Sequence, residues 1–149
     1  MEEKYAKVVV LIITNKDKDL FYMQQKDENY PIAKWRLYYT FFGGKIEENE
    51  LPLESLKREM YEELQKEIAR MLLGKARKVF NYDYDNGKAK RKYYVYESVL
   101  SDLDLKKIEN APIKEGKLGK IIQKKKLKDY KIVKSIKKIL EKYLMENTL

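Results

Sequence analysis

Residues 44–66 read GKIEENELPLESLKREMYEELQK, and this stretch decides how the rest of the chain is interpreted. Pro52 suits the first turn of a helix, because its fixed φ fits there and its missing N–H has no helical partner to lose. Beyond it, apolar residues recur at three- and four-residue spacings and form one stripe, made of Leu53, Leu56, Met60, Leu64 and Ile68. The stretch predicts an amphipathic helix that runs on through Met71 and Leu72 and ends near Gly74.

Three glutamates of this helix share one face, away from the apolar stripe. Glu59, Glu62 and Glu63 lie at i, i+3 and i+4. Like charges at this spacing destabilise an isolated helix by about 0.2–0.5 kcal/mol per pair, so the cluster needs a counter-charge. Hard divalent cations supply one, and Mg²⁺ bridges such carboxylates to substrate phosphates. The alternative is a solvated acidic face, which is common in a chain with 38% charged residues.

Residues at fixed offsets around the cluster favour the metal site. The order Gly44, Glu50, Arg58-Glu59-Met60, Glu62-Glu63 resembles the Nudix box, G-x5-E-x7-R-E-U-x-E-E-x-G-U, where U is a bulky apolar residue. Gln65 replaces the second glycine and Lys66 the last apolar residue, but neither change removes a carboxylate. Phe42 stands where many family members have a proline before the glycine pair, which should alter the loop more than the chemistry.

The resemblance implies hydrolysis of a nucleoside diphosphate linked to another moiety, by attack of water on phosphorus with Mg²⁺ or Mn²⁺. It assigns metal ligands to box carboxylates and to one main-chain carbonyl, namely Glu50, Glu59, Glu62, Glu63 and Gly43. Glu50 alternatively holds metal-bound water. Glu59 is alternatively the general base, and Arg58 would orient Glu59 and compensate its charge. Glu62 and Glu59 are therefore the expected catalytic carboxylates.

The resemblance implies that residues outside the box largely set the substrate. Within the box, Gly44 allows the main chain to approach a ligand closely. Tyr82 and Tyr84 lie where a tyrosine is associated with dinucleoside polyphosphate hydrolases, although their alternation also fits ordinary strand residues. Glu115 is preferred over Glu97 and Glu109 as a further carboxylate of the site, with a surface role as the alternative. Further aromatic candidates for stacking on a base, or for core packing, are Trp35, Tyr38 and Tyr5.

Composition excludes several other chemistries. The chain has 149 residues, with neither cysteine nor histidine. This excludes disulfides, thiolate nucleophiles, serine–histidine catalysis and histidine-bound metals. The N-terminal apolar run, residues 6–13, is too short to span a bilayer and lacks the features of a signal peptide. We therefore expect a cytoplasmic protein without membrane contact.

The net charge of +9 suggests an anionic partner, although lysine-rich surfaces also serve solubility. A small nucleotide is the favoured partner and substrate. One alternative is an RNA 5′-end pyrophosphohydrolase, and another is a non-catalytic nucleotide sensor. Lysines 124–126 lead into a C-terminal helix over residues 129–144, whose apolar stripe predicts packing on the domain rather than RNA binding. Many relatives are dimers, so a homodimer stays open.

Runs of β-branched and aromatic residues between turn signals predict strands. They cover residues 7–14, 20–24, 37–42, 75–84, 90–100 and 118–123. Residues 27–34 are polar and predict a loop, and Asp85-Asn86-Gly87 predicts a hairpin turn. Strands on both sides of a helix indicate an α/β protein with a mixed sheet. The resemblance implies an α/β/α sandwich in a single domain over residues 1–149.

Overall fold

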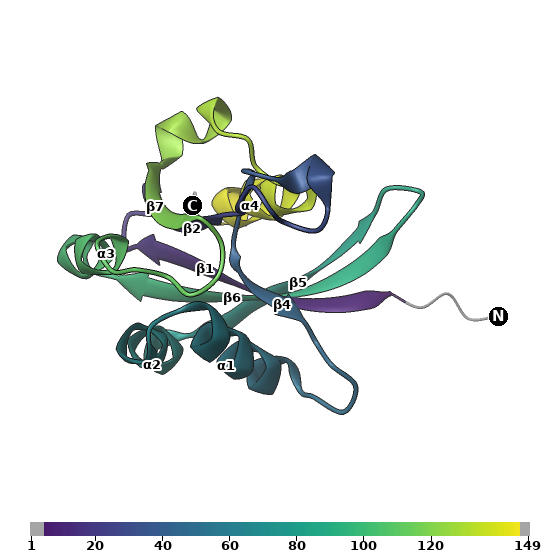
Figure 1. The fold of residues 1–149 in the computed structure, drawn as a ribbon, viewed down its shortest axis with the longest axis horizontal. Coiled ribbons are helices and arrows are strands. Elements are labelled where there is room, and N and C mark those ends of the chain that lie inside the picture. Colours follow the sequence, from purple (N-terminus) through teal and green to yellow (C-terminus); the bar gives the residue numbers. More distant parts are fainter. Residues whose placement is uncertain (1–4, 147–149) are drawn as a thin grey trace.

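A seven-stranded mixed sheet runs through the centre of the protein, whose residues 5–146 are described here from a computed structural model (Figure 1). The long central strand β1 (Ala6–Asn15) pairs in parallel with β6 (Lys90–Leu100) along its whole length. The outer strand β5 (Arg77–Asp85) is antiparallel to β6 and forms with it a hairpin that projects from the body.

The other edge of β1 is shared by two strands. Near its start, β1 pairs with β4 (Phe42–Lys45), and near its end it pairs with β2 (Leu20–Gln25). Strand β2 continues the sheet through β3 (Tyr39–Thr40) and β7 (Leu118–Gln123). The sheet therefore divides beside β1, and this division opens the space in which the cavity described below lies.

Helices cover both faces of the sheet. Helices α1 (Pro52–Glu63) and α2 (Lys66–Lys75) lie on one face, α4 (Lys134–Glu146) lies on the other, and α3 (Asp102–Glu109) lies near β7 (Figure 1). Alternate residues of β1 serve the two cores. Val9 and Leu11 pack in the α1 layer, whereas Val10 and Ile12 pack in the α4 layer. The predicted α/β/α sandwich around a mixed sheet is confirmed.

The predicted continuous helix is wrong, because the chain breaks between α1 and α2. Leu64 is extended (φ −125°, ψ 159°) and fully buried, and it pairs with Ile113 as an isolated bridge. The Glu63 carbonyl accepts a hydrogen bond from the Lys114 N–H at 2.7 Å. A distant loop thus supplies the partner that the next helical turn would have supplied.

Other boundaries also differ from the prediction. The predicted strand over 37–42 is split, since Leu37 has φ 67° and the chain then crosses from β2 to β1 through β3 and β4. The loop over 27–34 runs into a short 3₁₀ turn, Ala33–Trp35. The C-terminal helix begins at Lys134 instead of residue 129, because Ile132 bridges to Tyr39.

Helix α3 was not predicted, although Ser101 caps it by accepting a hydrogen bond from the Asp104 N–H at 3.1 Å. The predicted packing of the C-terminal helix is confirmed by the burial of Ile136, Ile139, Leu140 and Tyr143. Within residues 5–146, no helix combines the length and the apolar character that a membrane crossing requires.

Candidate active site

A glycine pair lets the carboxylates of α1 come against the main chain of β4. Gly43 has φ +140°, and a side chain there would collide with the Val9 carbonyl across the strand pair. At Gly44, an added methyl group would collide with the carboxylate of Glu59. Gly43 thus requires glycine because of its backbone conformation and the nearby main chain, whereas a side chain at Gly44 would displace the Glu59 carboxylate.

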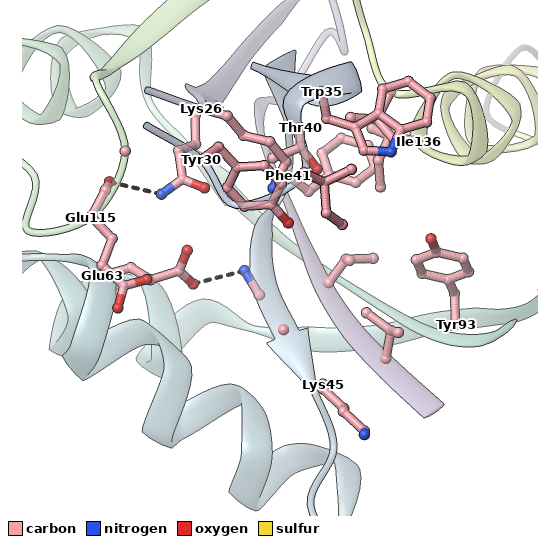
Figure 2. Close-up of a pocket in the computed structure, with 18 of the residues that line it drawn as sticks. Lys26, Tyr30, Trp35, Thr40, Phe41, Lys45, Glu63, Tyr93, Glu115 and Ile136 are labelled. Atoms are coloured by element: carbon pink, nitrogen blue, oxygen red, sulfur yellow. Dashed lines mark hydrogen bonds between the residues drawn. The ribbon is translucent and has the colours of Figure 1, made fainter. Parts of the chain in front are cut away.

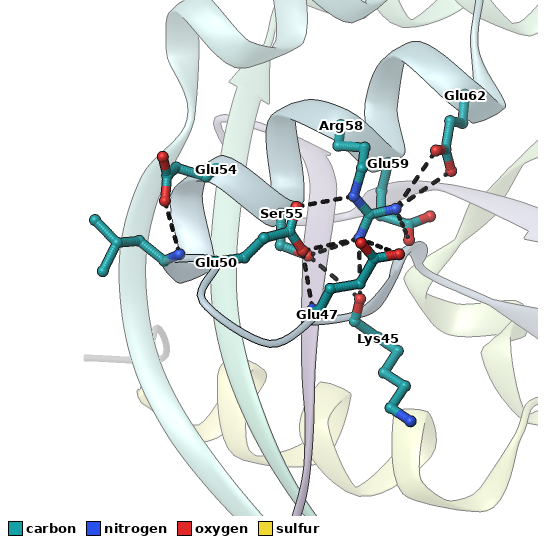
Figure 3. Close-up of polar contacts among 9 residues, drawn as sticks. Lys45, Glu47, Glu50, Glu54, Ser55, Arg58, Glu59 and Glu62 are labelled. Atoms are coloured by element: carbon teal, nitrogen blue, oxygen red, sulfur yellow. Dashed lines mark hydrogen bonds and ion pairs between the residues drawn. The ribbon is translucent and has the colours of Figure 1, made fainter.

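Arg58 of α1 lies at the centre of a group of carboxylates (Figure 3). Its guanidinium binds Glu50 through two bonds, Nε to Oε2 at 2.9 Å and Nη2 to Oε1 at 3.0 Å. Nη1 donates to Glu59 Oε1 at 3.0 Å and reaches Glu62 at 3.4 Å. The bonds from Arg58 lower the pKa of Glu50 to about 2. Arg58 therefore organises the box, with the Lys45 carbonyl as a further acceptor at 3.1 Å.

Glu59 and Glu63 are the desolvated carboxylates of the box. Glu63 is only 3% exposed and accepts a hydrogen bond from the Gly43 N–H at 2.9 Å. Burial raises the pKa of Glu63 well above its ordinary value, against the effect of this bond, and the charges of Glu59 and Glu115 raise it further. Burial also raises the pKa of Glu59, which Arg58 partly opposes. The two groups therefore form a negative site that its protein neighbours only partly compensate.

A cavity of about 490 Å³ opens beside this cluster (Figure 2). Glu63, Glu115 and Gln24 lie at one end, and the Gln24 side-chain amide donates to the Glu115 carbonyl at 2.8 Å. Tyr30 and Trp35 of the β2–β3 loop form one wall. Tyr93 of β6 and Ile136 of α4 lie away from the carboxylates (Figure 2). The cavity therefore has an acidic end, and aromatic, apolar and basic side chains line the rest of it.

The donor set suits Mg²⁺ or Mn²⁺. Both ions prefer oxygen ligands, and a cation would relieve the repulsion between the buried Glu63 and the half-buried Glu59. Within residues 5–146, no three acidic side chains are arranged, as they stand, so that they could hold a metal ion together. Arg58 draws Glu50, Glu59 and Glu62 to its guanidinium, while Glu63 turns toward Gly43.

The structure brings together most of the predicted site residues. Glu50, Arg58, Glu59 and Glu62 form one cluster, and Glu63 meets the Gly43–Gly44 main chain at the cavity. Of the predicted substrate residues, Glu115 and Gly44 line the cavity. Tyr82 and Tyr84 lie on β5 and pack against the core of the α4 layer, so neither lines the cavity.

The aromatic candidates are also separated. Trp35 lines the cavity, and Tyr38 packs against Trp35 edge-to-face with ring centroids 5.1 Å apart. Tyr5 lies at the start of β1 and is 38% exposed. Sequence reasoning missed Gln24, Lys45, Arg91 and Tyr93, which all line the cavity. The spacing of Arg91 and Tyr93 placed them on one strand face, but no local signal showed which face borders the cavity.

Comparison with known proteins identifies the class. The sequence matches the NUDIX domain family over residues 4–142, so the chain belongs to the Nudix family and the resemblance of its box is confirmed. As a member of that family it is a Nudix hydrolase, the class of enzyme that the sequence predicts. A comparison with curated protein sequences finds no significant match.

Solved structures share the fold at low sequence identity. The MutT protein from Methanosarcina mazei Go1 is 18% identical, with 100% of this chain and 99% of that chain covered and a TM-score of 0.71. The NUDIX domain of Shewanella oneidensis NrtR, complexed with ADP ribose, is 11% identical, with 99% and 91% covered and a TM-score of 0.66.

A bifunctional NMN adenylyltransferase/ADP ribose pyrophosphatase from Francisella tularensis, complexed with AMP and Mn ion, is 16% identical to this chain. The match covers 97% of this chain and 42% of that chain, with a TM-score of 0.64. At these identities the likeness establishes the fold.

Proposed function

We propose that this protein is a metal-dependent pyrophosphohydrolase that cleaves a nucleoside diphosphate linked to another moiety. One observation carries the proposal: the carboxylates of the box meet a nucleotide-sized cavity at the Gly43–Gly44 main chain. Glu63 belongs to both, since it lines the cavity and accepts the Gly43 N–H. Glu59 lies directly behind Gly44.

Mg²⁺ or Mn²⁺ is the proposed cofactor, in line with the Mn ion named for one of the structural neighbours. Glu62 and Glu63 would hold it, with Glu50 and the Gly43 carbonyl as further oxygen donors. When bound, the ion would polarise the phosphoryl oxygens and neutralise charge that develops on the phosphates.

The side chains of the box divide the remaining work. Glu59 is the proposed general base, which removes a proton as the water oxygen bonds to phosphorus. The bond between that phosphorus and the bridging oxygen breaks, and the leaving phosphate keeps the electron pair. Arg58 holds Glu59 at 3.0 Å and thereby fixes where the proton is accepted. Because Glu50 binds Arg58 through two bonds, Glu50 positions the arginine.

The cavity supports binding of a nucleoside next to the box. Trp35 and Tyr30 offer aromatic surface to a base on the loop wall. Glu115 faces the box closely enough for its charge to raise the pKa of Glu59 and Glu63. We therefore propose Glu115 as a further carboxylate of the site, which supports the preference for it over Glu97 and Glu109.

The test is release of phosphate and pyrophosphate with Mg²⁺ across a panel of nucleotides. The panel contains nucleoside triphosphates, oxidised triphosphates, ADP-ribose, diadenosine polyphosphates and 5′-triphosphate RNA. Glu62→Gln should abolish turnover, whereas Glu67→Gln, an exposed glutamate of α2 outside the site, should leave it unchanged. Turnover on RNA alone would favour the 5′-end alternative. Absence of turnover on every substrate, with Mg²⁺ and with Mn²⁺, would overturn the proposal in favour of a sensor.

A further inference from the structure

The floor of the cavity is one face of three neighbouring strands. It consists of Ala6, Val8 and Val10 on β1, Gly43 and Lys45 on β4, and Arg91 and Tyr93 on β6. The pairing aligns them in rows: Val8 lies opposite both Lys45 and Tyr93, and Ala6 lies opposite Arg91. Residues at i and i+2 of a strand share a face, so these side chains lie on the cavity side of the sheet.

The two ends of this floor carry opposite charge. Glu63 and Glu115 lie at the Gly43 end. Lys45 follows two residues beyond Gly43 on β4, and Arg91 lies further along the floor on β6; these two residues are here called the far-end cations. Among residues 5–146, no carboxylate forms an ion pair with either far-end cation. Arg58 and Arg77, by contrast, each bind a carboxylate within 3.0 Å. Asp27, the other acidic residue of the lining, accepts the Asn29 N–H within its own loop.

Arg91 is held in place by the core of the α4 layer. Its Nη1 donates to the Tyr93 hydroxyl at 3.4 Å, and that hydroxyl lies 2.7 Å from the Ser135 Oγ of α4. Tyr93 and Ser135 are both buried. A guanidinium carries five N–H donors, of which this contact uses one. The remaining donors of Arg91 have no partner within the described residues, so a positioned cation borders the cavity.

Arg91 lies at some distance from the box. Ala6, opposite Arg91, is four residues along β1 from Val10, opposite Gly43. With about 3.3 Å per residue and about 4.8 Å between strands, the Cα atoms of Arg91 and Gly43 are roughly 16 Å apart. Such a separation places Arg91 at the nucleoside end of a nucleotide whose anhydride lies at the box.

We infer that the far-end cations bind a second phosphate group, separate from the anhydride that is cleaved. The substrate class is then a nucleotide that also carries a phosphate at its nucleoside end. The inference rests on the proposed function, because it takes the Glu63 end as the one that holds the anhydride. A planar guanidinium binds phosphate through paired hydrogen bonds, and Lys45 adds a point charge. The phosphate could belong to a small nucleotide or to the next nucleotide of an RNA or DNA strand.

Trp35 makes a binding test direct, since it is the only tryptophan of the chain and lines the cavity. Its fluorescence is titrated with AMP, GMP, adenosine 3′,5′-bisphosphate and the 5′-phosphorylated dinucleotide pApA. We expect the bisphosphate to bind about 10- to 100-fold more tightly than AMP. Arg91→Gln should remove most of this preference. Arg70→Gln, on the exposed surface of α2, should keep it.

Lys45→Gln is the second variant and should reduce the preference by a smaller factor, which keeps the test open if Arg91→Gln does not fold. Equal binding of AMP and the bisphosphate by the unaltered protein would overturn the inference. So would a preference for GMP that Arg91→Gln removes, because arginine also pairs with the edge of guanine. If the bisphosphate preference is found, tight binding of pApA indicates that the second phosphate belongs to a nucleic-acid strand. Weak binding of pApA indicates that it belongs to a small nucleotide.

Measuring hydrolysis together with binding distinguishes failure of this inference from failure of the proposed function. Turnover that Glu62→Gln abolishes, together with equal affinity for AMP and the bisphosphate, would overturn the inference alone. A bisphosphate preference without turnover on any substrate would overturn the proposed hydrolysis and leave the cavity as a binding site for the bisphosphate.

Discussion

At the scale of the residue, substitution of glycine by alanine should change the free energy of unfolding in opposite directions at Gly43 and Gly74. Gly43→Ala should lower the free energy of unfolding by about 1–3 kcal/mol or more, because φ is +140° and the new methyl group meets the Val9 carbonyl. Gly74→Ala should raise it by up to about 1 kcal/mol, since Gly74 lies in α2 with open space around it. Urea denaturation of both variants checks this, and shifts of the same sign would contradict it.

Arg58 gives a second expectation at this scale. Arg58→Lys keeps the charge but loses the paired bonds to Glu50, so Glu59 is no longer held in position. We expect kcat/KM to fall about 10- to 100-fold. Steady-state kinetics with the best substrate of the panel measures the effect, and Arg70→Lys is the control. Unchanged kcat/KM in Arg58→Lys would show that the arginine geometry is not needed.

The cluster around Arg58 was predictable from fixed offsets, because a helix places Glu59 and Glu62 on one face. The difference in burial between Glu62 and Glu63 was not predictable from the sequence. Glu63 is buried against Gly43, whereas the Glu62 side chain is 49% exposed. This contrast depends on where β4 and the Glu115 loop pass, and adjacent positions of one helix carry no sign of it.

At the scale of the element, Glu97 joins four parts of the fold. This buried carboxylate of β6 accepts the Tyr143 hydroxyl of α4 at 2.6 Å and binds Arg77 at 2.8 Å. Lys18, in the turn before β2, adds a contact at 3.4 Å. Burial by itself would raise the pKa of Glu97, but these three partners together lower it. Glu97 therefore anchors α4, and its predicted alternative role as a carboxylate of the site is not supported by its place.

The lowered pKa of Glu97 predicts how the free energy of unfolding depends on pH. A carboxyl whose pKa is lower in the folded state stabilises the fold above its unfolded pKa, and this is lost as pH falls through the folded pKa. The free energy of unfolding should therefore drop below about pH 4.5, and it should drop less in Glu97→Gln. At neutral pH, Glu97→Gln should be less stable by about 1–3 kcal/mol. Denaturation curves from pH 7 downward measure this. Glu141→Gln, in an exposed pair of α4, should keep the unaltered slope.

Most elements were predictable because their signals are local. Strand β1 is a long apolar run, β6 is rich in tyrosine and valine, and Pro52 marks the start of α1. The failures share one cause, which is a partner from a distant part of the chain. Ile113 and Lys114 break the helix after Glu63, and Tyr39 holds Ile132 extended before α4. Apolar spacing continues across such a break, so periodicity cannot reveal it.

At the scale of the whole molecule, divalent ions should stabilise the fold. An ion bound at 100 times its Kd adds about 2.7 kcal/mol to the free energy of unfolding, which is roughly 5–10 °C in Tm for a chain of this size. Thermal melting in Mg²⁺ should therefore exceed melting in EDTA by about this amount. The difference should disappear in Glu63→Gln and persist in Glu67→Gln. Equal melting temperatures of the unaltered protein in both conditions would contradict the metal site.

The α/β/α layering could be predicted because helices and strands alternate along the chain. The cavity could not. It exists because β2 and β4 share one edge of β1, and because the β2–β3 loop and the start of α4 close over the gap. Residues more than 80 positions apart, such as Val8 and Arg91, therefore form one surface that no single stretch of sequence encodes.

The Gly43–Gly44 main chain lies between the residues proposed for hydrolysis and the residues proposed for ligand selection. The groups proposed to act in hydrolysis approach it from α1, and the residues that would choose the ligand lie across it on β1, β6 and α4. Two glycines, which have no side chains, thus separate the proposed reacting groups from the residues proposed to select the ligand. If the proposed roles hold, substitutions in Arg91, Tyr93 or the aromatic loop should change ligand preference while the groups proposed for hydrolysis stay in place.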